Sequence, residues 1–214
     1  MANRKVKFKN GDYYHIYNKS IDHIEVFSDL SDYNRFLYLI DYYRYTGHEL
    51  SYSQFKRTSI ITKETYLKRH YIKKCLQVEI LAFCLIPNHY HFLIKQRKSG
   101  GVQKFIGEII NAYTKYKNIK TQRKGNIFLQ PFREKALHNT NAILHVSRYI
   151  HNNPYKHNLV NNFEDCVRFS FSSLKHYIAD QKISFISDDK LQEICSKNSH
   201  SYLDYCQAPF NVGG

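Results

Sequence analysis

The sequence predicts an α+β fold, a ferredoxin-like sandwich in which helices pack mainly on one face of an antiparallel sheet. The chain has 214 residues and is 43% hydrophobic, which is enough for the core of one large domain. Short strand-like segments alternate with longer segments whose apolar residues repeat at helical spacing. Their order is strand, helix, strand, strand, helix, strand-like segment and helix, which favours an antiparallel sheet.

The first strand and the first helix are expected near the N-terminus. Residues 12–18 are aromatic and β-prone, which is typical of a strand. Ser31 or Asp32 is expected to cap a helix that continues to about Tyr45. Residues 46–75 are polar and contain a single helix-like stretch, so we interpret them as a surface insertion.

Two strands joined by a tight turn are predicted at the centre of the chain. Residues 79–86 are expected to form a buried strand, because 80–86 are continuously apolar, and Pro87 and Asn88 provide the turn. In the second strand His89 and His91 are two residues apart, so their side chains project from the same face. Two adjacent imidazoles make half of a divalent-metal site. The spacing alone is a weak signal, because hairpin histidines can also bind nothing.

The second half of the chain predicts two more helices and an extended segment. An amphipathic pattern over 102–113 indicates a helix, which continues into a basic segment closed by Gly125. Residues 126–137 are expected to be extended. Asn139 or Thr140 caps the last long helix, which should end at Asn153 because Pro154 disfavours helix in the residue before it. We therefore expect one domain over 1–180 and a C-terminal extension over 181–214.

The charge is strongly basic and unevenly distributed. The net charge is +14, but residues 180–214 hold three Lys or Arg and five Asp or Glu, so the rest of the chain carries +16. Cations attract phosphates, and the 19 Tyr and 14 Phe can stack on unpaired bases. A nucleic-acid partner is expected, although codon bias in an AT-rich genome would also enrich lysine and tyrosine.

Cysteine usage and hydropathy favour a cytoplasmic protein. The five cysteines are scattered and form no Cys-x-x-Cys pair, which excludes a disulfide framework and a structural zinc site. The basic N-terminus has no apolar stretch after it, so it does not resemble a signal peptide. The longest apolar run, 80–86, is too short to span a membrane, and no membrane partner is expected.

The last long helix contains a candidate nucleophile. His145, Tyr149 and Asn153 are four residues apart and share one helix face. A phenol with a pKa near 10 is a weak nucleophile, and a bound divalent cation would assist its attack on a phosphodiester. With Asn153 as a third ligand beside the two histidines, Mg²⁺ or Mn²⁺ is expected. A partly buried structural tyrosine is the alternative for Tyr149.

Four segments of the chain resemble the HUH single-strand DNA transposases, and most closely their REP-associated tyrosine transposase branch. The first is an opening strand and the second a metal motif with two histidines around one residue. The third is a Phe-rich segment ending in Arg133, and the fourth is a tyrosine helix. They occupy residues 11–20, 85–94, 125–133 and 147–157.

The resemblance implies a role for each candidate residue. Tyr149 would form a 5′-phosphotyrosine link to single-stranded DNA at a hairpin-flanked site. His89, His91 and Asn153 would hold Mg²⁺ or Mn²⁺. Cations expected to contact DNA phosphates are Arg133, Arg148, Lys156, Lys120, Arg123 and Lys124. A solvated surface role for Arg133 and Lys156 is nearly as well supported.

Other functions and assembly states stay open at this point. One alternative is a domesticated, non-catalytic protein that binds hairpin DNA or RNA on the same fold. Another is a relaxase or replication initiator, although the chain has no helicase segment and no Gly-x-x-x-x-Gly-Lys loop. In some relatives the tyrosine helix is exchanged between two subunits, so both a homodimer and a monomer are possible.

Overall fold

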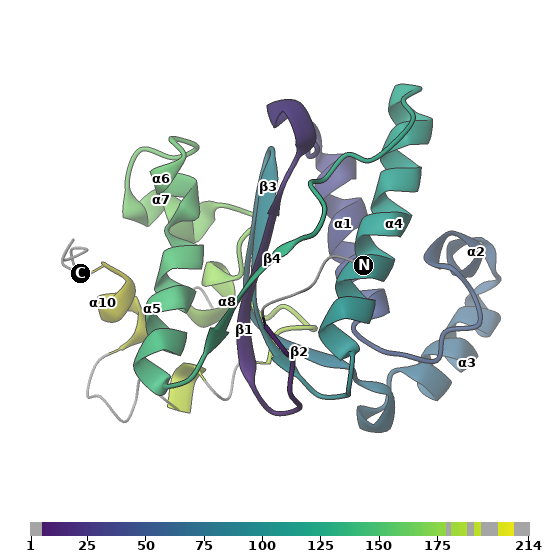
Figure 1. The fold of residues 1–214 in the computed structure, drawn as a ribbon, viewed down its shortest axis with the longest axis horizontal. Helices are drawn as coiled ribbons and strands as arrows, with labels where there is room; N and C mark the ends of the chain where they lie inside the picture. The colour runs from purple at the N-terminus through teal and green to yellow at the C-terminus, as the bar shows by residue number, and fades with distance from the viewer. Residues whose placement is uncertain (1–5, 179–180, 188–190, 194–200, 208–214) are drawn as a thin grey trace.

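A four-stranded antiparallel sheet forms the centre of the computed structural model, which describes residues 6–178, 181–187, 191–193 and 201–207. The strands are β1 (Tyr13–Lys19), β2 (Val78–Ile86), β3 (His89–Gln96) and β4 (Arg133–Leu137). Their order across the sheet is β2-β3-β1-β4, so β1 lies between β3 and β4. The predicted α+β fold with helices packed on an antiparallel sheet is confirmed (Figure 1).

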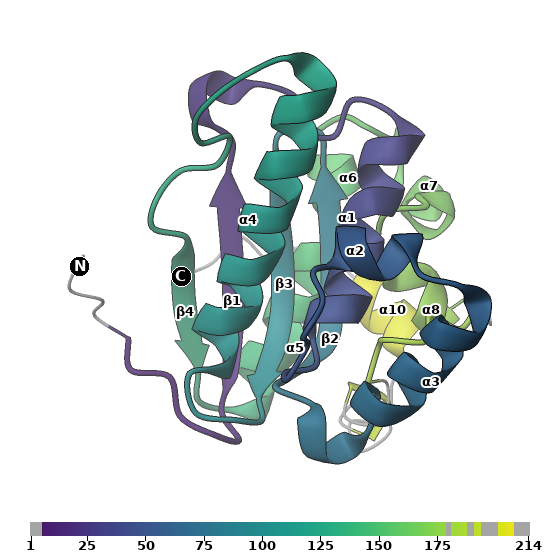
Figure 2. The same ribbon diagram turned by 90° about the vertical axis from the view of Figure 1, so that its right-hand side faces the viewer.

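Helices cover both faces of this sheet, whereas the sequence placed them mainly on one. Figures 1 and 2 show α1 (Leu30–Tyr43) and α4 (Gly101–Thr121) on one face, with α5 (Thr140–His151) on the other. The reason lies in β3, which is buried on both sides. Phe92 belongs to the core under α1 and α4, while its neighbour Leu93 belongs to the core under α5.

The two cores differ in composition. Aromatic rings dominate the core under α1 and α4, where the Phe36 ring centroid lies 5.0 Å from that of Tyr113 and 4.9 Å from that of Phe27. Aliphatic side chains such as Leu93 and Ile150 dominate the core under α5. Three short helices pack at its border, namely α7 (Phe163–Arg168), α8 (Leu174–Ile178) and α10 (Tyr202–Gln207).

C-terminal segments protect the outer edge of β2. The backbone N–H of Leu85 donates to the carbonyl of Phe171, and the N–H of Ser173 donates to the carbonyl of Phe83. Ser187 donates in the same way to Ile80 at 2.9 Å. Pairing of this kind removes the open hydrogen-bonding groups of an edge strand. Residue 187 lies beyond the expected boundary at 180, and the division at that point stays a prediction.

The region 46–75 contains two α-helices where the sequence predicted one helix-like stretch. These are α2 (Tyr52–Arg57) and α3 (Ile60–His70), followed by the 3₁₀ turn η2 (Lys73–Cys75). Ser51 and Gln54 cap α2 reciprocally, a capping-box signal that was present in the sequence. Tyr52, Phe55 and Tyr66 join the aromatic core, so this region is attached to the body of the protein.

Helix α1 begins earlier than expected, because Asp29 caps it while the Asp32 side chain pairs with lysines of α4. Asp29, and not Ser31 or Asp32, is the N-cap, and its carboxylate accepts from the backbone N–H of Asp32 at 3.1 Å. The Asp32 carboxylate is fully buried and is paired with Lys117 and Lys120 of α4. The short 3₁₀ turn η1 (Ile21–His23) precedes this region.

The chain does not leave the helical conformation at Asn153. Helix α5 ends at His151, and α6 (Asn153–Lys156) follows after one residue with Pro154 in its first turn. Proline is tolerated there because the first N–H groups of a helix have no intrahelical acceptor. Asn139 caps α5 as predicted. Among the described residues, no helix combines the length and apolar character needed to cross a bilayer.

Candidate active site on the α5 face

His89 and His91 lie side by side on β3, as their two-residue spacing predicts. Their ring centroids are 5.1 Å apart, and only 3% and 5% of their surfaces are exposed. On the adjacent strand β1, Lys19 is opposite His89 and Tyr17 is opposite His91. Opposite residues in an antiparallel pair share a face, so β1 and β3 form the floor of the site together.

Each of the two imidazoles is held through one of its nitrogens. The Nδ1 of His89 lies 2.6 Å from Oδ1 of Asn88, which accepts a hydrogen bond from it. The Nδ1 of His91 lies 3.0 Å from Nε2 of His15 on β1. With Nδ1 engaged in both rings, Nε2 is the nitrogen left for a ligand. Metal-bound histidines usually have their second nitrogen fixed in this way.

Burial keeps the site imidazoles neutral. It lowers the pKa of His15 to about 4, with a smaller effect from Lys135. It also lowers the pKa of His89 to about 4, where His157 and Lys19 contribute further. Burial and the neighbouring histidines lower the pKa of His91 well below its ordinary value. A neutral imidazole keeps the lone pair that a cation needs, so these rings are suited to metal binding at neutral pH.

Tyr149 lies above this floor on α5. Its ring centroid is 5.5 Å from that of His91 and 5.8 Å from that of His15, both in edge-on contact. Burial, with a smaller contribution from Tyr17, raises the pKa of the phenol. The ammonium of Lys156 lies 4.3 Å from the centroid of the Tyr149 ring. The candidate nucleophile therefore has imidazoles and a cation beside it.

Asn153 presents a buried oxygen that lacks a partner. Its Nδ2 donates to the carbonyl of Tyr149 at 2.8 Å, which fixes the amide. The residue is 0% exposed, and its Oδ1 has no hydrogen-bond partner within the described part of the chain. A buried acceptor without a donor is costly unless a ligand satisfies it. This orphaned oxygen is the observation that fits a cation at the site.

Two imidazoles and one amide oxygen make a mixed donor set for a hard divalent ion. They suit Mg²⁺ or Mn²⁺, and the nitrogens favour Mn²⁺. No group of three or more His, Cys, Asp or Glu side chains suited to a metal occurs among the described residues. The candidate site thus depends on the amide of Asn153 as its third protein ligand.

The structure adds residues that sequence reasoning did not assign to the site. His157 packs against His89 with ring centroids 4.5 Å apart, and Lys19 and Lys135 lie on the floor strands. His15, Tyr17 and Lys19 are two residues apart along β1, so their side chains share one face. This two-residue spacing was visible in the sequence. Only the pairing of β1 with β3 places the three residues beside His89 and His91.

The cations predicted to contact DNA lie in different places. Arg133 is exposed on β4 and shares a row with Tyr17 and His91, so it lies on the floor of the site. Lys156 contacts Tyr149 as described. Arg148 is 8% exposed, and its guanidinium lies 5.5 Å from the centroid of the Tyr205 ring.

Lys120, Arg123 and Lys124 lie away from this site. They occur at the C-terminal end of α4 and just beyond it, and α4 covers the other face of the sheet. The ammonium of Lys120 is 2.6 Å from the carboxylate of Asp29 and 2.7 Å from that of Asp32. Its charge is largely compensated within the protein.

Comparison with known proteins gives a matching family profile and several similar solved structures. A family profile described as "Transposase IS200 like" matches residues 51–153, which contain His89, His91, Tyr149 and Asn153. A solved structure of a REP-associated tyrosine transposase bound to a REP hairpin is similar, with a TM-score of 0.56 and 18% sequence identity. The match covers 89% of this chain and 93% of that chain. No curated protein sequence matches significantly.

The family match and the structural match agree with the four motifs quoted above. At 18% identity the structural likeness establishes the fold, and the profile match covers the segment with both histidines and the tyrosine. The predicted resemblance is confirmed: residues 51–153 match the IS200-like transposase family, and the fold is similar to that of a REP-associated tyrosine transposase.

Proposed function

We propose that this protein cleaves and rejoins single-stranded DNA at hairpin-flanked sites, with Tyr149 as the nucleophile. The observation that carries the proposal is the contact between Tyr149 and His91, whose ring centroids are 5.5 Å apart. The unpartnered Oδ1 of Asn153 supports it, since the same amide donates to the Tyr149 carbonyl at 2.8 Å. The similar REP-associated transposase is bound to a REP hairpin, which supports hairpin DNA as the partner here.

The chemistry is an exchange of one phosphoester bond for another. The phenolic oxygen of Tyr149 attacks the phosphorus of a phosphodiester and loses its proton. The bond from phosphorus to the 3′ oxygen breaks, and that oxygen leaves as a 3′-hydroxyl after gaining a proton. The product is a 5′-phosphotyrosine link with the bond energy retained. Attack by a second 3′-hydroxyl reverses the step and frees Tyr149.

Divalent metal dependence is part of the proposal. His89, His91 and Asn153 would hold Mg²⁺ or Mn²⁺, which would polarise a phosphate oxygen and offset the charge that develops there. His15 and Asn88 orient the two imidazoles, and Lys156 and Arg133 offer cations to the phosphates on either side. In this arrangement one chain would supply all of these residues.

The test is a covalent-adduct assay with the full chain. Labelled single-stranded hairpin DNA, from the flanks of the gene where possible, is incubated with the protein and Mn²⁺ or Mg²⁺, and in parallel with a chelator. We expect a denaturation-resistant protein–DNA band that requires the metal and is lost in Tyr149→Phe. Hairpin binding by Tyr149→Phe should stay within about twofold of wild type, because the substitution removes one hydroxyl and no charge.

Two results would contradict the assignment. An adduct that persists in Tyr149→Phe would place the nucleophile on another tyrosine. Tight hairpin binding without any adduct, across several flanking hairpins and both metals, would instead favour the non-catalytic DNA- or RNA-binding alternative. A cytoplasmic location and the oligomeric state stay predictions.

A further inference from the structure

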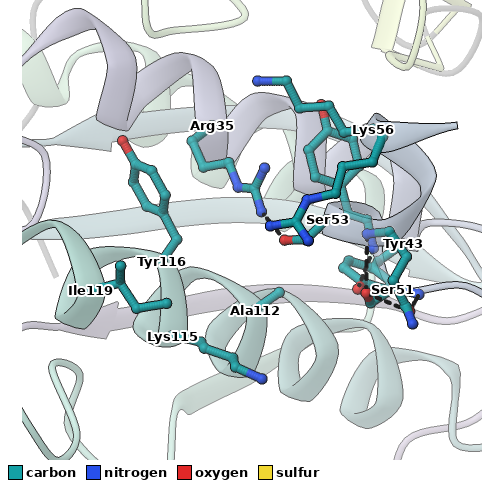
Figure 3. A pocket seen from close by; sticks show the side chains of 12 residues that line it. Arg35, Tyr43, Ser51, Ser53, Lys56, Ala112, Lys115, Tyr116 and Ile119 are labelled. Carbon is teal, nitrogen blue, oxygen red and sulfur yellow. Dashed lines mark hydrogen bonds between the residues drawn. The ribbon is translucent and has the colours of Figure 1, made fainter.

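A cavity lies on the opposite side of the sheet from Tyr149. It has a volume of about 770 Å³ and lies between α1, α2 and α4 (Figure 3). This volume falls within the range of roughly 300–1,000 Å³ that is usual for ligand pockets. The sheet and the aromatic core separate it from the candidate active site, so it is a distinct feature of the molecule.

The charge of this cavity is uniformly positive. Four cations line it, Arg35 from α1, Lys56 and Arg57 from α2, and Lys115 from α4, and no carboxylate is among its lining residues. Within the described part of the chain, none of the four forms an ion pair. Clustered cations without compensating carboxylates attract an anionic partner.

The cations on the other turns of α4 behave differently. Lys117 and Lys120 are paired with Asp32, and Lys104 faces Glu108 at 4.0 Å. Lys115 lies on the same helix but is exposed and is among the residues that line the cavity (Figure 3). The positive charge at the cavity is therefore a local property and does not simply follow from a lysine-rich helix.

Arg35 is held by its neighbours, and part of its guanidinium remains available to donate hydrogen bonds to a ligand. Its guanidinium carbon lies 4.5 Å from the centroid of the Tyr52 ring and 5.3 Å from that of Tyr116. One terminal nitrogen donates to Oγ of Ser53 at 2.7 Å, and its buried Nε has no hydrogen-bond partner among the described residues. A guanidinium that contacts two aromatic rings and a hydroxyl is suited to a phosphate, because little side-chain freedom remains to be lost.

We propose that this cavity binds an unpaired nucleotide and its neighbouring phosphates in single-stranded DNA. The phosphates would lie between Lys115 on one wall and Lys56 and Arg57 on the other, with Arg35 between them. The partly exposed ring of Tyr116 would contact the base, since aromatic rings accept any base by stacking. Four cations exceed the charge of one phosphate, which favours a strand over a free nucleotide. This inference rests on the proposed function, because it adds a second contact to the same class of DNA.

The test measures binding without chemistry. Affinity for a fluorescent oligothymidylate of about 20 nucleotides is measured by anisotropy in chelator, over a series of salt concentrations. The double variant Lys56→Ala with Arg57→Ala removes two exposed cavity cations. A matched double variant, Lys68→Ala with Lys74→Ala, removes two exposed cations from the same region that do not line the cavity.

We expect the cavity variant to bind on the order of tenfold more weakly, and its salt slope to fall by roughly 1.4, as two lost phosphate contacts on single-stranded DNA would give. The matched variant should lose less than threefold. Equal losses in both variants, or no loss in either, would overturn the inference. Circular dichroism of both variants verifies that they are folded.

Crosslinking of the unmodified chain gives an independent measurement. An oligonucleotide with 5-bromodeoxyuridine is irradiated with the protein, and crosslinked peptides are identified by mass spectrometry. Crosslinks at Tyr52 or Tyr116 support the cavity as the site, and crosslinks confined to the Tyr149 face overturn it. If the adduct forms while the cavity fails both tests, only this inference is lost. If the cavity passes both and no adduct forms, the proposed chemistry is lost instead.

Discussion

The two faces of the sheet are built from different kinds of residue. Under α1 and α4, β1 and β3 contribute Tyr14, Ile16, Tyr90 and Phe92, which pack into an aromatic core. Under α5 the same two strands contribute histidines and lysines along with Leu93. One face contributes most of the packing, while the other holds polar groups that packing alone does not require.

This difference indicates that the residues that stabilise the fold and the residues proposed for catalysis lie mainly on different faces of the sheet. Buried imidazoles and the unpaired Oδ1 of Asn153 are a cost to folding on the α5 face. The apolar packing of the aromatic face offsets that cost. Substitutions on the α5 face should therefore alter activity more than stability, and substitutions on the other face should do the reverse.

The largest effect is expected from the paired substitution His89→Ala with His91→Ala. Both imidazoles that would hold the cation are removed, so adduct formation should fall by at least a hundredfold, on the order of what one catalytic electrostatic contribution supplies. Band intensity with Mn²⁺ measures this. His138→Ala, an exposed histidine outside the site, is the control. A double variant that still responds to metal would show that the cation binds elsewhere.

Asp32→Asn tests the opposite face. It leaves the ammonium of Lys117 buried without a charged partner, so the free energy of unfolding should fall by about 3–5 kcal/mol. Urea unfolding followed by circular dichroism measures it. The exposed Asp29→Asn should change the free energy of unfolding far less, because solvent screens its ion pair with Lys120. Adduct formation per folded molecule should be unchanged in both variants, and its selective loss would break the proposed separation of the two faces.

His15→Ala should weaken metal binding without removing it. His15 holds the Nδ1 of His91 at 3.0 Å, and loss of such a partner typically costs 10–100-fold in metal affinity. Titration with Mn²⁺, followed by electron paramagnetic resonance, measures the affinity directly. His15→Asn, which keeps an acceptor on β1, should recover part of the loss. Unchanged affinity in His15→Ala would show that His91 is positioned without it.

The smallest effect is expected from low pH, which should reduce the free energy of unfolding through His151 of α5. Burial lowers the pKa of His151 to about 3, and its ring contacts Ser173 and Tyr202 at 2.7 Å. The unfolded chain therefore binds more protons below pH 6.5, so stability falls as pH decreases from there towards 3. Between pH 8 and pH 5 this histidine should account for about 2 kcal/mol.

The measurement is thermal unfolding of wild type, His151→Gln and His138→Gln at both pH values. The decrease between pH 8 and pH 5 should be smaller in His151→Gln than in wild type. His138 is exposed, so its variant should follow wild type. An equal decrease in all three proteins would assign the acid sensitivity to the other buried histidines.

Local sequence patterns predicted most of the helices and strands, and they predicted that His89 and His91 project from the same face of their strand. The β2–β3 hairpin, α4 and the Asn139 cap of α5 all depend on residues close in sequence, and the structure has each of them. His15 as a partner of His91 depends on strand pairing across 76 residues, which local patterns do not encode. The helices on both faces were missed for the same reason.

The pairing of β1 also constrains how this protein is made. Its partners are β3, at 89–96, and β4, at 133–137, so the first strand to leave the ribosome is among the last to be paired. The β2–β3 hairpin can form early, because its strands are joined by a two-residue turn. Until residue 137 has emerged, β1 is incomplete on at least one edge and exposes aromatic side chains. A nascent chain paused before that point would be especially prone to aggregation. It would also lack the candidate active site, because Tyr149 and Asn153 come later in the chain.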